Sequence, residues 1–275
     1  MNTFMQTFFE SGGIACNASL LKQEKGVVLF GGFVESFHHI LKNMDFKTDS
    51  TERSIFLLSP LHFNPFNFTQ FVYEVGSEEA VIALLAYGLS TFGGKNLQDF
   101  SKTFDVGYFA SECNFSEEEL EEIVQIYEKF GLIFLVGEDL VRHKNVKNIA
   151  RILALLSVEL KNLKVVFLES KIEKTFIKNS EITPLNSLES YDGLVVYVRE
   201  NIKKGSILEV SKQFCMVSKM QDGAKVKIKL ESNQEVVAQM QCNVEIKGMV
   251  GILWTPVSIL QEDFCYQLVS LSKAA

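Results

Sequence analysis

The stretch Ser116-Glu-Glu-Glu-Leu-Glu-Glu-Ile-Val-Gln-Ile-Tyr-Glu-Lys-Phe-Gly-Leu-Ile-Phe-Leu-Val136 decides the fold. Ser116 followed by Glu119 is a capping-box pattern, which starts a helix, and the apolar residues after it recur at helical spacing. The helix is expected to end near Gly131. The apolar run Leu132–Val136 then has the length and composition of a buried strand. One helix followed by one buried strand is the repeating unit of a parallel α/β sheet.

The same alternation extends to both sides of this stretch. Strand, helix, strand order predicts parallel pairing with right-handed crossovers. Residues 61–71, with two prolines nearby and several Phe and Asn, are expected to form an irregular loop. We therefore predict an α/β domain over residues 1–200, in which the first fifty residues have no assigned role. The expected strands are residues 26–31, 55–59, 163–168 and 194–198, and the expected helices are residues 34–43, 77–90 and 145–160.

The character of the sequence changes after residue 170. Residues 171–190 are polar and weakly periodic, which indicates a connection. Short β-segments follow, separated by turn signals such as Asp222-Gly223, where we expect glycine to supply a positive φ. This spacing predicts a small β-barrel domain over residues 205–275. The expected strands are residues 207–210, 226–230, 236–240 and 249–253.

Composition and charge exclude several classes of protein. A 275-residue chain with 47% hydrophobic residues can build a large core, and its net charge of −7 gives no electrostatic reason to bind nucleic acid. No apolar run approaches the roughly 20 residues that a membrane helix needs. Residues 1–10 lack the basic start of a secretory signal. We expect a soluble, cytoplasmic protein that reaches a membrane only through partners.

The cysteines and glycines give no cofactor pattern. The five cysteines are widely spaced, so we expect free thiols rather than disulfides or a metal site. Gly31-Gly32 follows a predicted strand but lacks the three-glycine spacing of a dinucleotide site, and Gly12-Gly13 is no better. A tight strand-to-helix turn is the favoured role of Gly31-Gly32.

The four histidines are also expected to be structural. His38 and His39 are adjacent and point in different directions on a helix, and His62 has no acid or Cys at ligand spacing. His143 follows Asp139 by four residues, which could place both on one helical face, but no third ligand is in view. We expect each of the four to lie at the surface or to be buried in the core with its hydrogen bonds made.

Two acidic groups remain as candidates. Glu138-Asp139 follows a predicted strand, and the carboxyl ends of parallel strands are where α/β proteins place ligands. The pair could bind a cation or act as acid and base, or it could stabilise the start of the next helix. The run of acids within residues 117–122 is either a solvated helix face or a docking patch for a basic partner.

The loop at residues 61–71 has an unusual concentration of aromatic rings. Four phenylalanines fall in or beside it, where an isolated domain normally has polar residues. Either the rings anchor the loop in the core, or they form an exposed patch for a partner. The four residues are Phe63, Phe66, Phe68 and Phe71.

Several segments resemble a known family, the large iron–sulfur subunit of bacterial respiratory complex I, in its C-terminal, molybdopterin-oxidoreductase-like portion. The resemblance covers about two thirds of the chain and is most specific in the centre. The C-terminal segments are similar to the terminal barrel of molybdopterin oxidoreductases. The segments are Phe71-Val-Tyr-Glu-Val-Gly-Ser-Glu-Glu-Ala-Val-Ile-Ala-Leu-Leu-Ala86, Val106-Gly-Tyr-Phe-Ala-Ser-Glu-Cys-Asn-Phe-Ser-Glu-Glu-Glu-Leu120, Leu135-Val-Gly-Glu-Asp-Leu140, Lys147-Asn-Ile-Ala-Arg151, Asp222-Gly-Ala-Lys-Val-Lys-Ile228, Glu235-Val-Val237 and Lys247-Gly-Met-Val250.

The chain also departs from that family. Nothing in it supplies the cysteine ligands of the family's iron–sulfur clusters, and the link to the barrel is shortened. The resemblance therefore implies a reduced scaffold: a non-catalytic, peripheral-arm subunit of an NADH:quinone oxidoreductase-like respiratory complex, whose partners are the other subunits. We predict no catalytic, cofactor-binding or metal-binding residues and no cofactor. The alternatives are a molybdopterin- or nucleotide-binding oxidoreductase and a stand-alone interaction protein.

Overall fold

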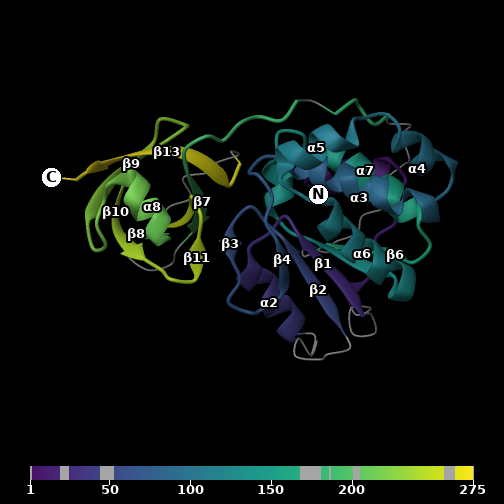
Figure 1. Ribbon diagram of the computed structural model, residues 1–275, viewed down its shortest axis with the longest axis horizontal. Coiled ribbons are helices and arrows are strands. Elements are labelled where there is room, and N and C mark those ends of the chain that lie inside the picture. Colours follow the sequence, from purple (N-terminus) through teal and green to yellow (C-terminus); the bar gives the residue numbers. More distant parts are fainter. Residues whose placement is uncertain are drawn as a thin grey trace. The chain divides into compact units, whose positions relative to one another are not determined.

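The computed structural model describes residues 2–18, 25–43, 53–167, 181–185, 187–200, 205–256 and 264–274. The chain divides into two compact units (Figure 1). The first unit contains Met1–Ser59 and Phe66–Glu189, and the second contains Pro60–Pro65 and Ser190–Ala275. The short segment Pro60–Pro65 thus belongs to the second unit although both of its sequence neighbours belong to the first.

The first unit is built on a five-stranded sheet in which every neighbouring pair of strands is parallel. The strands lie in the order β4-β2-β1-β5-β6. All five residues of β1 and all five residues of β5 are buried, which explains their uninterrupted apolar runs. The predicted parallel α/β sheet is confirmed. The strands are β1 (Gly26–Phe30), β2 (Ser54–Leu58), β4 (Thr69–Phe71), β5 (Leu132–Val136) and β6 (Leu163–Phe167).

The helices of this unit pack around α3, which is apolar on all sides and buried along nearly its whole length. Figure 1 shows α4, α5 and α7 gathered with α3, while α2 lies apart from this group beside β2 and β4. Helices α1, α4 and α5 were not predicted, because each has eight residues or fewer. The helices are α1 (Thr3–Glu10), α2 (Val34–Asn43), α3 (Glu78–Leu89), α4 (Lys95–Phe100), α5 (Val106–Cys113), α6 (Glu117–Phe130) and α7 (Val146–Glu159), with the 3-10 turns η2 (Ser90–Phe92) and η3 (Asp139–Arg142).

The starts of α6 and α3 are fixed in different ways. At α6 the capping box is present: the Glu119 amide donates to Ser116 Oγ (3.2 Å), and the Ser116 amide donates to Glu119 Oε2 (2.8 Å). At α3 the side chain of Ser77 does not cap the helix. Its hydroxyl instead donates to the Glu74 carbonyl, which fixes the turn before the helix.

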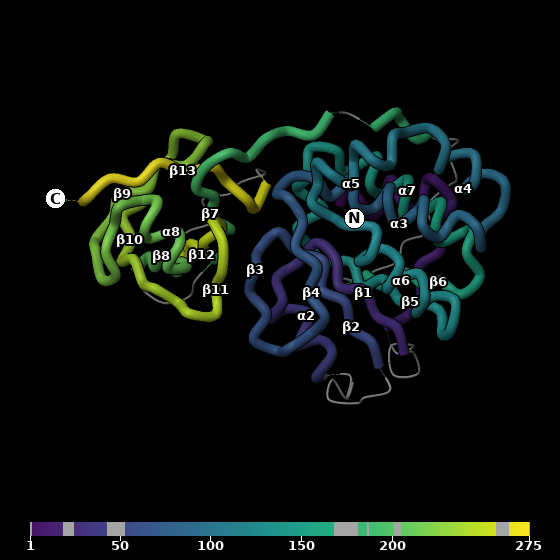
Figure 2. The backbone as a smooth tube through the Cα atoms, in the orientation of Figure 1, coloured from purple at the N-terminus to yellow at the C-terminus, as the bar shows by residue number. Residues whose placement is uncertain are grey.

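The second unit is a closed six-stranded barrel in the order β10-β8-β12-β7-β13-β9 (Figure 2). Tyr197 and Phe214 are among its largest fully buried side chains. The predicted small barrel is confirmed. Its strands are β7 (Leu194–Glu200), β8 (Ser206–Val210), β9 (Lys225–Leu230), β10 (Glu235–Cys242), β12 (Val250–Thr255) and β13 (Tyr266–Lys273), joined by helix α8 (Lys212–Ser218) and by the two-stranded pair of β3 (His62–Phe63) and β11 (Ile246–Lys247).

The position of β7 differs from the prediction, which placed it in the α/β domain and began the barrel at residue 205. Strand β7 pairs in parallel with β12 and antiparallel with β13, so the barrel cannot close without it. The main boundary therefore lies between Glu189 and Ser190. A run of apolar residues gives no information on which sheet a strand joins. The prediction from the sequence therefore placed β7 in the wrong domain.

The aromatic loop is anchored in the core. Phe63, Phe68 and Phe71 are buried, with no more than 7% of each side chain exposed. Phe66 is half-buried and stacks on His38, with 3.7 Å between the ring centroids. The alternative of an exposed four-ring patch is therefore wrong, and the segment holds two short strands, β3 and β4, rather than an irregular loop.

Within the described part of the chain, no helix has the length and apolar character needed to cross a membrane.

The turn at Gly223 provides a stability test for the barrel. Gly223 has φ +76°, as predicted, and its amide donates to the Met240 carbonyl (3.0 Å). A Cβ there would meet no atom within 4 Å, so the cost of substitution is conformational only. We expect Gly223→Val to lower the free energy of unfolding of the barrel by roughly 1–3 kcal/mol. Chemical denaturation followed through Trp254 measures this change, and an unaltered midpoint would contradict it.

Candidate functional site

The carboxyl edge of the parallel sheet is the first place to look for a site. After β1 the chain turns to β2 on one side of it, whereas β5 lies on the other side, so the order of strands reverses between β1 and β5. In open α/β sheets, ligands bind in the crevice at such a switch point. The loops that border this position are Gly31-Gly32 after β1 and Gly137-Glu138-Asp139 after β5.

These two loops are in direct contact. The Gly137 amide donates to the Phe30 carbonyl (2.8 Å), and the Asp139 amide donates to the Gly31 carbonyl (2.9 Å). A Cβ on Gly137 would lie 2.2 Å from the Gly31 oxygen and 2.5 Å from the Gly32 Cα. The backbones of the two loops are therefore packed against each other at the switch point, and the tight turn at Gly31 (φ +69°) brings them together.

The predicted acidic pair Glu138-Asp139 does not form one site. Glu138 is exposed, whereas Asp139 is 3% exposed and begins η3. His143 comes one residue after this turn, and it pairs with Glu78 of α3. The acids of the predicted run Glu117, Glu118, Glu121 and Glu122 are all exposed on α6, as either interpretation requires.

A buried polar cluster lies at the starts of α3 and α7, the two helices that follow β4 and β5. His143 Nε2 is 3.1 Å from Glu78 Oε2 and 3.2 Å from the Gly76 carbonyl oxygen, and both side chains are almost completely buried. Nε2 thus lies within hydrogen-bonding distance of both the Gly76 carbonyl and the Glu78 carboxylate. The Asn145 amide donates to Nδ1 (3.0 Å), which fixes the orientation of the ring.

Charge and burial act in opposite directions on His143. Burial alone would lower its pKa, but the hydrogen-bonding contact and charge of Glu78, assisted by the Gly76 carbonyl and the charge of Glu79, outweigh it and raise the pKa. For Glu79, burial raises the pKa of the carboxyl group even though Asn148 and Asn145 donate to it. His143 is therefore a buried titratable group whose protonated form is favoured by the carboxylates beside it.

Asn148 uses the same cluster to hold a distant segment of the chain. Its Nδ2 donates to Glu79 and also to the Thr183 carbonyl (3.0 Å), and its Oδ1 accepts from the Thr183 amide (2.8 Å). Asn145 donates to the other oxygen of Glu79 (2.6 Å). Ile182 is among the apolar residues that pack on the core beside this contact. The cluster therefore fixes the segment that leads to the barrel.

The burial of Glu78 and Glu79 was not predicted from the sequence. The available signal was the rest of the helix: no polar residue except Tyr87 follows them, so the helix had to be enclosed on all sides. The prediction that His143 is a satisfied core residue is consistent with its contacts. His38 stacks on Phe66 in the first unit and His62 belongs to β3 in the second unit, so the structure does not gather the histidines.

The cysteines are all free, as predicted. Burial raises the pKa of Cys113 to about 12, which makes it unreactive. Cys215 and Cys242 are brought together by the barrel although 26 residues separate them in sequence: burial, and then the side chain of Cys242, raise the pKa of Cys215. Among the described residues, no group of three or more His, Cys, Asp or Glu side chains could hold a metal ion.

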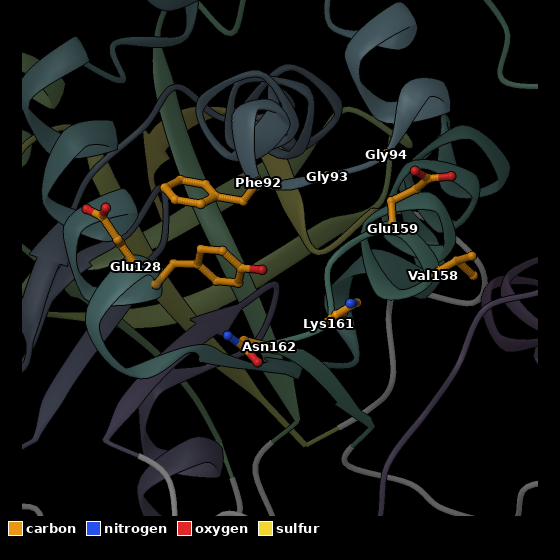
Figure 3. Close-up of a pocket in the computed structure, with 9 residues that line it drawn as sticks. Phe92, Gly93, Gly94, Glu128, Val158, Glu159, Lys161 and Asn162 are labelled. Atoms are coloured by element: carbon orange, nitrogen blue, oxygen red, sulfur yellow. The ribbon is translucent and has the colours of Figure 1, made fainter.

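A cavity of about 620 Å³ lies at the opposite, amino edge of the sheet, where α6 and α7 end before β5 and β6 (Figure 3). Phe92 and Glu128 lie on one side of it, Val158 and Glu159 on the other, and Lys161 and Asn162 below. No sequence motif pointed to it, because its residues come from three separate segments of the chain. The lining residues are Phe92, Gly93, Gly94, Tyr127, Glu128, Val158, Glu159, Lys161 and Asn162.

Comparison with known proteins adds no assignment: no family model matches the chain, and no curated protein matches it.

Proposed function

We propose that this chain is a non-catalytic, peripheral-arm subunit of a complex like NADH:quinone oxidoreductase, in which it contributes structure and docking surface without a redox centre of its own. The observation that carries this proposal is the backbone contact of Gly137 with Gly31 and Gly32 at the switch point of the sheet. A molybdopterin- or nucleotide-binding enzyme of this architecture needs that position for its ligand. The close packing of the two loops that border this position supports a role without such a ligand.

The buried polar cluster supports the same proposal. Glu79 accepts hydrogen bonds from Asn145 and Asn148, and Asn148 holds both backbone groups of Thr183. These polar groups are used to fix one part of the chain on another. Such a use is structural, and it accounts for the burial of the Glu79 carboxylate, which would otherwise be costly.

The kind of assembly is suggested by the resemblance to the large iron–sulfur subunit of complex I. The resembling central segments, Phe71 to Ala86 and Val106 to Leu120, contain the end of β4, most of α3, all of α5 and the start of α6. The resembling C-terminal segments fall in β9, β10 and the start of β12. The proposed partners are therefore the other subunits of that assembly, through which alone the chain would contact a membrane.

Cofactor content and partners test this proposal together. We expect the purified chain to show no visible absorption and no stoichiometric iron, molybdenum or zinc, and we expect a tagged chain to recover iron–sulfur subunits from native membranes. Metal analysis, absorption spectroscopy and mass spectrometry measure these results. About one metal ion or one pterin per chain would overturn the non-catalytic role, and recovery of no respiratory subunit would leave a stand-alone interaction protein.

A further inference from the structure

We propose that the cavity between the ends of α6 and α7 binds an arginine side chain presented by a partner protein. This inference rests on the proposed docking function and names the chemistry of one contact. The cavity, of about 620 Å³, falls in the range of roughly 300–1,000 Å³ that is usual for binding pockets.

Two glycines give the cavity its wall. A Cβ on Gly94 would lie 2.1 Å from Glu159 Oε2, and a Cβ on Gly93 would lie 2.6 Å from Leu97 Cδ2. Glycine at position 94 therefore allows the carboxylate to lie close against the backbone. The other oxygen, Glu159 Oε1, accepts a hydrogen bond from Asn96 Nδ2 (2.8 Å), so Glu159 is held at this place before any partner binds.

The electrostatics of the cavity favour a cation. Glu128 and Glu159 line it against a single basic residue, Lys161. Helices α6 and α7 both end here, at Phe130 and Glu159, and the carboxyl end of a helix carries partial negative charge. Two carboxylates and two helix ends together outweigh one lysine, so a positively charged group is the ligand that this arrangement suits.

An exposed aromatic ring specifies the kind of cation. Phe92 is 39% exposed and makes a T-shaped contact with Tyr127, with 5.2 Å between ring centroids. The exposed part of the Phe92 ring offers aromatic surface to the cavity, and Val158, 51% exposed, adds an apolar rim. A guanidinium group is planar, stacks on aromatic rings and donates two parallel hydrogen bonds to a carboxylate. An ammonium group stacks less well and cannot make this paired contact. Arginine is therefore the side chain that fits.

Tyr127 forms a wall of the cavity rather than a reactive group. It is buried, and burial raises the pKa of its hydroxyl even though the backbone of Asn162 hydrogen-bonds to it. Its position is fixed from both sides, by Phe92 and by Asn162.

A titration with a short peptide tests the proposal on the full chain. The probe is the capped tripeptide Gly-Arg-Gly, and the matched control peptide carries citrulline, which has the shape of arginine without its charge. We expect the arginine peptide to shift the amide resonances of Gly93, Gly94 and Asn162 saturably in two-dimensional NMR spectra, while the citrulline peptide does not at the same concentrations. Equal responses to both peptides, or no saturable shift with either, would overturn the proposal.

Three variants, each of which neutralises one charged side chain, make the test sharper. Glu159→Gln should weaken binding of the arginine peptide by about tenfold, because it keeps the acceptor for Asn96 but removes the charge. Lys161→Gln should strengthen binding several-fold. Glu121→Gln changes the same charge on the exposed face of α6, away from the cavity, and should leave binding unchanged. Spectra that superimpose outside the cavity verify that each variant folds, and unchanged affinity in Glu159→Gln would contradict the proposal.

The same variants separate this inference from the proposed function. If the arginine peptide binds but no respiratory subunit is recovered from membranes, the proposed assembly is wrong and the site stands. If the subunits are recovered equally with wild type and Glu159→Gln while the peptide fails to bind, the assembly stands and the site is wrong.

Discussion

Gly137→Ala is expected to destabilise the α/β unit by roughly 3 kcal/mol or more, because the new Cβ has no place to go. It would lie 2.2 Å from the Gly31 oxygen and 2.5 Å from the Gly32 Cα, and both are backbone atoms anchored by β1. The hydrogen bonds from Gly137 to Phe30 and from Asp139 to Gly31 would have to lengthen or break. Urea denaturation followed by circular dichroism measures the change in the free energy of unfolding.

Gly107→Ala is the matched control for this substitution. Gly107 lies in α5, and a Cβ there meets only Asp105 Oδ1, at 3.6 Å. Alanine in a helix is favoured over glycine by about 0.5–1 kcal/mol, so this variant should be slightly more stable than wild type. If Gly137→Ala were as stable as Gly107→Ala, the two loops would have space between them, and the argument against a ligand at the switch point would be lost.

His143→Leu is expected to cost about 3–5 kcal/mol, because it leaves the buried Glu78 carboxylate without the imidazole that lies 3.1 Å away. The double variant His143→Leu with Glu78→Leu removes both members of the pair. It leaves no unpaired buried charge, so it should be more stable than His143→Leu alone. His39→Leu, at an exposed position of α2, should change stability by no more than about 0.5 kcal/mol. A double variant less stable than the single one would mean that Glu78 is not destabilised by losing His143.

The pH dependence gives this prediction a second readout. Because the pKa of His143 is raised in the folded chain, the stability linked to its protonation is fully present below its unfolded pKa of about 6.5 and is lost as pH rises through the folded value. The difference in unfolding free energy between wild type and His143→Leu should therefore be largest near pH 6 and smaller near pH 9. The charges that face the ring are those of Glu78 and Glu79.

The sequence predicted the elements that depend on local signals. The cap at Ser116, the helix that follows it and the apolar strand Leu132–Val136 each carry their information within a few residues, and all three are present with the expected bounds. Strand β7 carries no such information, because its apolar run would suit a buried position in either sheet. Helix α8 was missed because it is short and lies between two strands of the barrel.

The site depends on contacts between distant residues, and these were the least predictable. Glu78 and His143 are 65 residues apart, and nothing in either local sequence indicates that they meet. Glu138 and Asp139 are adjacent and looked like a pair, yet one is exposed and the other is buried. Adjacent residues on a turn point in different directions, so a pair in sequence is weak evidence for a pair in space.

The short strand β3 has a consequence for how this chain can be made and divided. Residues Pro60–Pro65 are synthesised early but complete their pairing only when β11, near the end of the chain, has emerged. Until then the apolar side chains of Leu61 and Phe63 are not buried as they are in the folded chain. The nascent chain therefore exposes an apolar segment that chaperones can bind. An expression fragment that ends at residue 190 would lack β11, the pairing partner of this segment. We expect the fragment to aggregate unless residues 60–65 are replaced by a short polar loop.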